Sequence, residues 1–132
     1  MPTTKNMTAP TCCPKKPDLC DRPLLTPGQA AELMDLFKIL ASDTRLRLLH
    51  ALVRAGELCV SDLAETVGMT QQAVSNQLQR LADEGILGCR RDGKSIFYRV
   101  VDPCVTDLLD RGLCLAEDSR CRAARLPVTE RR

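Results

Sequence analysis

Apolar residues recur at helical spacing in five stretches of the chain, and two later stretches alternate apolar and polar residues. The first helical stretch opens with Thr26-Pro27-Gly28-Gln29, in which Thr can cap the helix, Pro can occupy its first position and Gln can complete a capping box. Its apolar residues are Ala30, Leu33, Met34, Phe37 and Leu40. This pattern predicts an amphipathic helix that ends near residue 40.

Three further helices are predicted between residues 43 and 84. Ser42 or Asp43 can cap the first of them, which Gly56 ends, and Gly68 separates a short helix at 60–67 from a longer one that Thr70 caps. The residues expected to be buried are Leu46, Leu49, Leu52 and Val53 in the first, Val60, Leu63, Ala64 and Val67 in the second, and Val74, Leu78 and Leu81 in the third.

The segments ILGCRR and SIFYRV, joined by Asp92-Gly93-Lys94, predict a β-hairpin, because Asp-Gly between alternating apolar runs favours a tight turn. We expect Cys89, in the first strand, to be a small buried hydrophobe. A last helix is predicted over about 103–116, with Val105, Leu108, Leu109 and Leu113 as its apolar stripe. The expected organisation is a proline-rich arm at 1–25, a domain at 26–116 and a charged, frayed tail at 117–132.

Helix, glycine turn, helix and hairpin in this order predict a mainly α, dimeric winged helix-turn-helix domain, in which the second helix enters the major groove and the wing contacts the backbone. The helix expected to read DNA exposes amides and few charges, whereas a solvated helix face more often pairs Glu with Lys. Amides can bind base edges, and Arg can bind guanine or phosphate. The candidate DNA-binding residues are Gln71, Gln72, Ser75, Asn76, Gln77 and Arg80 on the helix and Arg90, Arg91 and Lys94 on the wing.

The chain has 132 residues, eight cysteines and a formal net charge of +2, which is too small to identify a partner by itself. Its length suits one domain of about 100 residues with tails. No apolar run approaches the ~20 residues of a membrane-spanning helix, and the first 13 residues lack the apolar core of a secretory signal. We therefore expect a cytoplasmic protein with no membrane partner, in which thiols stay reduced.

Four segments of this sequence resemble the ArsR/SmtB family of metal-sensing repressors: DTRLRLL, ELCVSDL, QQAVSNQL and RRDGKSIFYR. The resemblance covers about residues 33–110. It implies a homodimer joined by the first and last helices, whose metal-free form binds operator DNA of a resistance operon and is released when metal binds. The chain departs from the family at Gln77, where a His is usual, and this difference bears on the operator sequence.

Cysteine chemistry is the remaining candidate for sensing, because the chain has one histidine, His50, and no C-x-x-C pair. The resemblance places a metal-binding Cys at Cys59, with Ser61 where many relatives have a second Cys. It favours Cys12, Cys13 and Cys20 of the partner's arm as the other ligands. The alternative set is Cys104, Cys114 and Cys121.

Cys104 and Cys114 would lie about 15 Å apart along one straight helix, so they could share an ion only across the dimer or with Cys59. Thiolates select soft ions; mercury(II) or arsenite is favoured, and cadmium or lead is compatible. This ion would be a regulatory effector, with no cofactor permanently bound. A thiol redox repressor on the same fold is an alternative function. A thiol enzyme or metal carrier is a more distant one, because the sequence shows no Cys–His pair and no glycine-rich loop after a strand.

Overall fold

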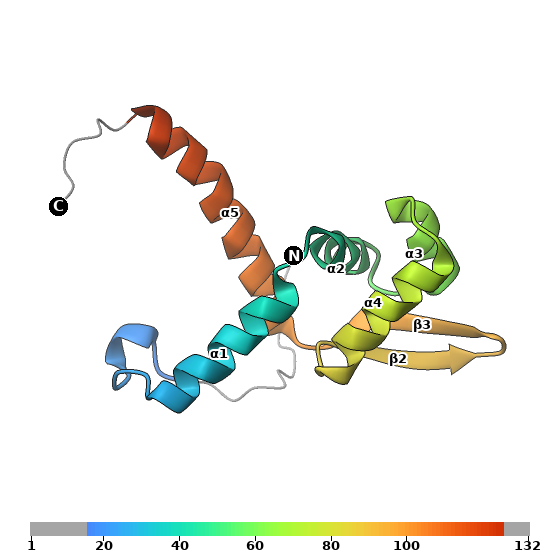
Figure 1. Cartoon of the computed structure of the whole chain (residues 1–132), viewed down its shortest axis with the longest axis horizontal. Helices are drawn as coiled ribbons and strands as arrows, with labels where there is room; N and C mark the ends of the chain where they lie inside the picture. The colour runs from blue at the N-terminus through green and yellow to red at the C-terminus, as the bar shows by residue number, and fades with distance from the viewer. Residues whose placement is uncertain (1–15, 126–132) are drawn as a thin grey trace, which may run out of the picture.

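The computed structural model describes residues 16–125, and describes side chains as far as residue 120. A 3-10 helix, η1 (Leu19–Asp21), precedes four helices: α1 (Pro27–Leu40), α2 (Asp43–Ala55), α3 (Val60–Val67) and α4 (Gln71–Asp83). Strands β2 (Leu87–Asp92) and β3 (Ser95–Val100) form the hairpin, and α5 (Pro103–Arg125) follows it. In Figure 1 the hairpin extends from one end of the molecule while α5 projects away from the body. None of the described helices is both long and apolar enough to span a membrane.

The predicted starts of α1, α2 and α4 are confirmed, and at each of them a side chain accepts a hydrogen bond from a free backbone N–H. Thr26 Oγ1 accepts from the Gln29 N–H at 3.1 Å, and the Gln29 side chain accepts from the Thr26 N–H at 3.0 Å. Ser42 caps α2 and Thr70 caps α4 in the same way. Gly68 ends α3 with a φ of 74°, a left-handed conformation that turns the chain sharply into α4.

The core lies between α2, α3, α4 and the root of the hairpin. Its fully buried side chains are Leu48, Leu49, Leu52, Leu63, Val74, Leu78 and Leu81. The prediction of a buried stripe on α2 was partly wrong, since Leu46 is 38% and Val53 36% exposed while the unpredicted Leu48 is buried. Both exposed residues instead line an apolar groove between α1, α2 and α5.

The hairpin was predicted within one residue, and it closes through Gly93, whose φ is 66°. A strand of two residues, β1 (Leu58–Cys59), was not predicted; it pairs with β3, so that the sheet order is β1-β3-β2. The prediction that Cys89 is buried was wrong. Cys89 lies on the edge strand β2 opposite Tyr98, beyond Leu87, which is the last residue of this strand in the core.

Helix α5 continues to Arg125, so the frayed tail expected from residue 117 is wrong for 117–125. The helix-favouring residues Glu, Ala and Arg of this stretch explain why the helix continues there. The described side chains from position 111 to 120 are all exposed. Helix α5 therefore contacts the body mainly through its first turns, where Val105 is buried.

Candidate nucleic-acid interface and thiol positions

Helices α3 and α4 form a helix-turn-helix whose second helix is held by its apolar face. Val74, Leu78 and Leu81 are completely buried against the core. At 100° per residue, the opposite face of α4 carries Gln72, Asn76 and the neighbouring polar residues. Thus packing of α4 directs a row of polar side chains to solvent, as reading of a DNA groove requires.

The exposed face of α4 is organised by hydrogen bonds between residues four positions apart. Gln72 Nε2 donates to Asn76 Oδ1 at 3.1 Å, and Gln79 Nε2 donates to Asp83 Oδ1 at 3.0 Å. Of the other candidate residues on this helix, Gln71 and Arg80 are exposed and Ser75 is half-buried. The structure therefore brings these candidates onto one helix with their polar groups accessible.

Gln77 differs from the other candidates on α4 because it is tied to another helix. Its Oε1 accepts a hydrogen bond of 2.8 Å from Arg45 Nη1, on α2. Both side chains are half-buried. Sequence pattern gave no sign of this contact across 32 positions, although Arg45 belongs to the DTRLRLL segment that carries the family resemblance.

The wing carries four cations that differ in their surroundings. Arg90 donates to both carboxylate oxygens of Glu57 at 2.8 and 2.9 Å, lies 3.7 Å from Asp92 and sits 4.7 Å above the Phe97 ring. The hydrogen bond from Arg90 lowers the pKa of the Glu57 carboxyl, and Glu57 in turn raises the pKa of Arg90. Arg90 is thus largely neutralised within the molecule, so its predicted phosphate contact competes with Glu57.

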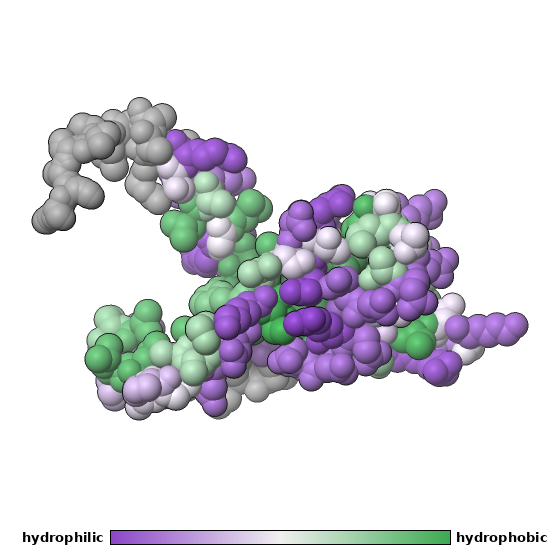
Figure 2. Space-filling model, in the orientation of Figure 1, coloured by the Kyte–Doolittle hydropathy of each residue, from purple (hydrophilic) through white to green (hydrophobic). Residues whose placement is uncertain are grey.

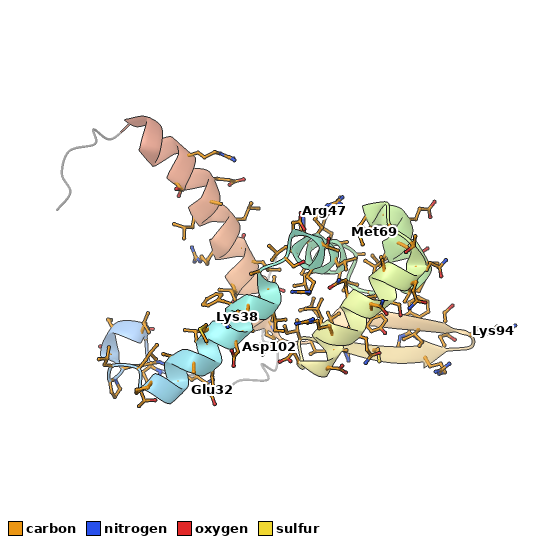
Figure 3. The ribbon with its side chains drawn as sticks, viewed as in Figure 1. Glu32, Lys38, Arg47, Met69, Lys94 and Asp102 are labelled. Carbon is orange, nitrogen blue, oxygen red and sulfur yellow. The ribbon has the colours of Figure 1, made fainter. Side chains whose placement is uncertain are left out.

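The other wing cations are Arg91, Lys94 and Arg99, all of them exposed. Lys94 stands at the tip of the hairpin (Figure 3), in the turn between β2 and β3. Among the described residues, none of these three makes an ion pair. Their charge is therefore available to phosphates, whose contacts set affinity and orientation.

The predicted thiol ligands are dispersed in the structure. Cys59 is half-buried at the end of β1, with its Sγ 3.2 Å from Ser61 Oγ, while Cys20 is exposed on η1. Figure 1 shows η1 at the opposite end of the molecule from α3. Cys12 and Cys13 lie outside the described residues. Within one protomer, Cys20 therefore cannot join Cys59 at a single ion.

The alternative thiol ligands lie along α5. Cys104 and Cys114 are exposed, and Cys114 Sγ donates to Asp118 Oδ2 at 3.6 Å. The negative charge of Asp118 raises the pKa of the Cys114 thiol. Cys121 lies on the same helix, in the part whose side chains are not described. No three His, Cys, Asp or Glu side chains gather at one point anywhere in the described part of the chain.

An open apolar groove of about 810 Å³ runs between α1, α2 and α5. Phe37, Leu46, Val53, Leu109 and Leu113 line it. Hydrophobic residues also show on the visible faces of α1 and α5 in Figure 2, on either side of the gap between them. Parts of the predicted apolar stripes are thus exposed, at Leu33, Met34 and Phe37 of α1 and at Leu113 of α5, whereas Leu40 and Val105 are buried.

The comparisons with known proteins agree with this geometry. Residues 42–87 match the model of the family described as bacterial regulatory protein, arsR family. The transcriptional repressor SmtB homolog of Synechocystis is 34% identical over 111 residues, which cover 74% of this chain and 83% of that protein. The chain belongs to the arsR family. As an ArsR-family protein it is a DNA-binding transcriptional regulator with a winged helix-turn-helix fold, and not an enzyme.

Two further similarities within the ArsR family bear on function. The crystal structure of the antimony-specific transcriptional repressor AntR superposes with a TM-score of 0.70 and 60% identity, covering 83% of this chain and 98% of that one. A probable mercury resistance operon repressor of Streptomyces lividans is 43% identical over 83 residues, which cover 63% of this chain and 66% of that protein.

Proposed function

We propose that this chain is a repressor that binds operator DNA of a resistance operon in its metal-free form and leaves the DNA when a thiophilic ion binds to cysteine thiolates. The observation that carries the DNA-binding part is the exposed amide row of α4 beside the unpaired cations of the wing. Amides can recognise base edges, and the wing cations can hold the backbone. Gln71, Gln72, Ser75, Asn76 and Gln77 are the proposed base-facing residues, and Arg80, Arg91 and Lys94 are the proposed phosphate contacts. Arg90, which the sequence also predicted to bind phosphate, is bound to Glu57 instead.

The DNA-binding form is proposed to be a homodimer. Phe37 of α1 is 47% exposed and Leu113 of α5 is 56% exposed, and both line the apolar groove. A two-fold axis through this region would cover both helices and present two recognition helices to successive major grooves. We expect a dimer in sedimentation at micromolar concentration, and Phe37→Glu should shift it to monomer. A wild-type monomer would contradict this arrangement.

The proposed effector is a trivalent ion of arsenic or antimony. The 60% identity to an antimony-specific repressor supports this choice, and soft thiolates suit such ions. Mercury(II) is the next candidate, supported by the 43% identical relative named for mercury resistance. Cadmium and lead, which are also thiophilic, complete the set of ions to be tested.

Two sets of cysteines are compatible with this function. In the first, Cys59 of one protomer is joined by Cys12, Cys13 and Cys20 from the arm of the other, which would tie the arm to the helix-turn-helix. In the second, two α5 helices pack antiparallel across the two-fold axis. Leu109 lies midway between Cys104 and Cys114 and lines the exposed groove. If the two-fold axis passes near Leu109, Cys104 of one protomer lies close to Cys114 of the other. Cys121 would complete the second set.

The exposed position of α5 makes the second set as strong a candidate as the first, and cysteine variants separate them. Release of operator DNA is measured by fluorescence anisotropy during titration with antimonite under reducing conditions. If the first set binds the ion, Cys59→Ser and the Cys12→Ser/Cys13→Ser double variant bind operator normally but resist release, while Cys114→Ser responds as wild type. If the second set binds it, Cys104→Ser and Cys114→Ser resist release and the arm variants respond. Unchanged release in every variant would contradict a thiolate site.

A further inference from the structure

The bond between Arg45 and Gln77 determines which part of the Gln77 amide can face a ligand. Gln77 lies on α4 next to the buried face, about 60° from its centre at 100° per residue. This flank of the helix lies against Arg45 of α2, which donates from Nη1 to Gln77 Oε1 at 2.8 Å. No other hydrogen bond of the Gln77 side chain occurs among the described residues.

The orientation of this amide is fixed by chemistry. The oxygen and nitrogen of a glutamine amide are hard to distinguish by shape, but a guanidinium has only N–H donors and no acceptor. The atom that faces Arg45 must therefore be the oxygen. A flipped amide would place two sets of N–H donors against each other in a half-buried position.

Arg45 itself is held firmly enough to act as an anchor. Its Nε donates to the Ile39 carbonyl at 2.6 Å, one of the carbonyls left free at the end of α1. Its backbone N–H donates to Ser42 Oγ at 3.3 Å in the cap of α2. The guanidinium is thus positioned by one bond to α1 and one to α4, and the second bond sets the orientation of the amide.

We propose that Arg45 is a positioning residue that makes Gln77 a hydrogen-bond donor and so directs it to guanine. A free glutamine pairs with adenine by accepting from N6 and donating to N7, which requires both amide atoms to face the base edge. Arg45 holds Oε1 against α2 and leaves the two Nε2 hydrogens. Guanine presents two neighbouring acceptors, O6 and N7, and the donor-only side chains Arg and Lys read it for this reason. This inference rests on the proposed operator binding.

The test measures the ratio of affinities for guanine and adenine at one operator position. A variant that weakens binding to all DNA equally leaves this ratio unchanged. Wild-type protein selects its preferred site from a pool of randomised DNA duplexes, and each base of that site is then varied in anisotropy titrations. The position read by Gln77 is the one at which Gln77→Met loses its preference. We expect guanine on one strand there, favoured over adenine at least about fivefold, and this ratio should fall to near one in Gln77→Met.

Two further variants test the donor role of Gln77 and the positioning role of Arg45. Gln77→Glu keeps an acceptor for Arg45 but has no outward donor, so its ratio should fall as in Gln77→Met. Arg45→Met frees the amide to turn and pair with adenine, so its guanine-to-adenine ratio should fall at least about fivefold. Gln79→Met is the matched control, because Gln79 bonds only to Asp83 of its own helix among the described residues; it should leave the ratio at this position unchanged. Thermal unfolding identifies any variant that fails to fold. If Arg45→Met does not fold, Arg45→Gln is measured in its place; its amide offers an oxygen as well as N–H groups to Gln77, so it no longer fixes the Gln77 amide, and the ratio should fall in the same way.

The inference is overturned if wild-type protein prefers adenine at this position, if Gln77→Met changes preference at no position, or if folded Arg45→Met keeps the guanine preference. In each case the wild-type protein still selects a defined site, so the proposed operator binding stands. If the wild-type protein selects no sequence at all, the proposed function fails and this inference fails with it.

Discussion

The two wing residues Lys94 and Arg90 should contribute very differently to DNA affinity, although both are cations on the same hairpin. Lys94 is exposed in the turn and has no ion pair among the described residues. Arg90 is bound by both oxygens of Glu57 at 2.8 and 2.9 Å. We therefore compare Lys94→Ala with Arg90→Ala, and expect only the first to remove a phosphate contact.

The size of this difference follows from counterion release. A plot of the logarithm of the binding constant against the logarithm of the salt concentration has a negative slope. Each phosphate that the protein neutralises makes this slope steeper by about 0.9. Lys94→Ala should make this slope shallower by about 0.9 for each wing, hence by about 1.8 for a dimer bound through both wings. The ratio of wild-type to Lys94→Ala affinity should therefore be about tenfold smaller at about 200 mM salt than at about 50 mM salt. Arg90→Ala should leave the slope nearly unchanged, because Glu57 already neutralises the guanidinium.

The assay is anisotropy of a labelled duplex, titrated with each variant at several salt concentrations, for the selected site and for a random sequence. Both sequences should show the same change of slope, since phosphates carry no base identity. Glu57→Gln adds a matched test, because it removes the charge that occupies Arg90 and should steepen the slope. The reasoning is refuted if Arg90→Ala and Lys94→Ala flatten the slope equally.

Three further predictions concern stability and thiol chemistry. Leu78→Ala, in the fully buried core, should lower the free energy of unfolding by about 2–5 kcal/mol in urea denaturation, whereas Leu24→Ala, at a residue 91% exposed, should change it by less than about 0.5 kcal/mol. Because Arg90 lowers the pKa of Glu57, the ion pair contributes its full stability above the ordinary carboxyl pKa and loses it as the pH falls through the lowered pKa. Glu57→Gln should remove this loss of stability in acid, measured by urea denaturation at several pH values. An unchanged dependence of stability on pH would contradict this prediction. Because Asp118 raises the pKa of Cys114, Asp118→Asn should increase the thiolate fraction at neutral pH and speed alkylation of Cys114 by iodoacetamide, measured by mass spectrometry of the Cys114 peptide; an equal or slower rate would show that Asp118 does not control the thiol.

Local signals in the sequence were sufficient to predict most of the fold. Thr26, Ser42 and Thr70 cap helices through contacts with residues three positions away, and Gly68 needs only its own backbone conformation. The buried residues of α4 were also predicted, because one face of that helix meets the core and the other is uniformly polar. Such features depend on short stretches of chain, where propensity and periodicity act directly.

The predictions that were wrong or incomplete depend on contacts between distant parts of the chain. Leu46 and Leu48 both fit an apolar pattern on α2, and only the packing of α2 against α3, α4 and β3 decides which of them faces the core. Cys89 is exposed because it lies on β2 beyond Leu87, where the core ends, and this limit depends on how the hairpin packs on the helices. The bond between Arg90 and Glu57 spans 33 positions, so no local pattern could show that one wing cation was already neutralised.

The metal-free dimer bound to its selected operator, titrated by anisotropy with candidate effectors, tests the central claim most directly. The reduced complex is exposed in turn to antimonite, arsenite, mercury(II), cadmium, lead and zinc, and in a separate arm to a thiol oxidant without metal. We predict release by antimonite or arsenite at stoichiometric concentrations and none by zinc, with the released protein carrying bound ion in native mass spectrometry. Release by the oxidant alone, with thiol-reactive ions ineffective, would contradict this account and indicate a redox-sensing repressor.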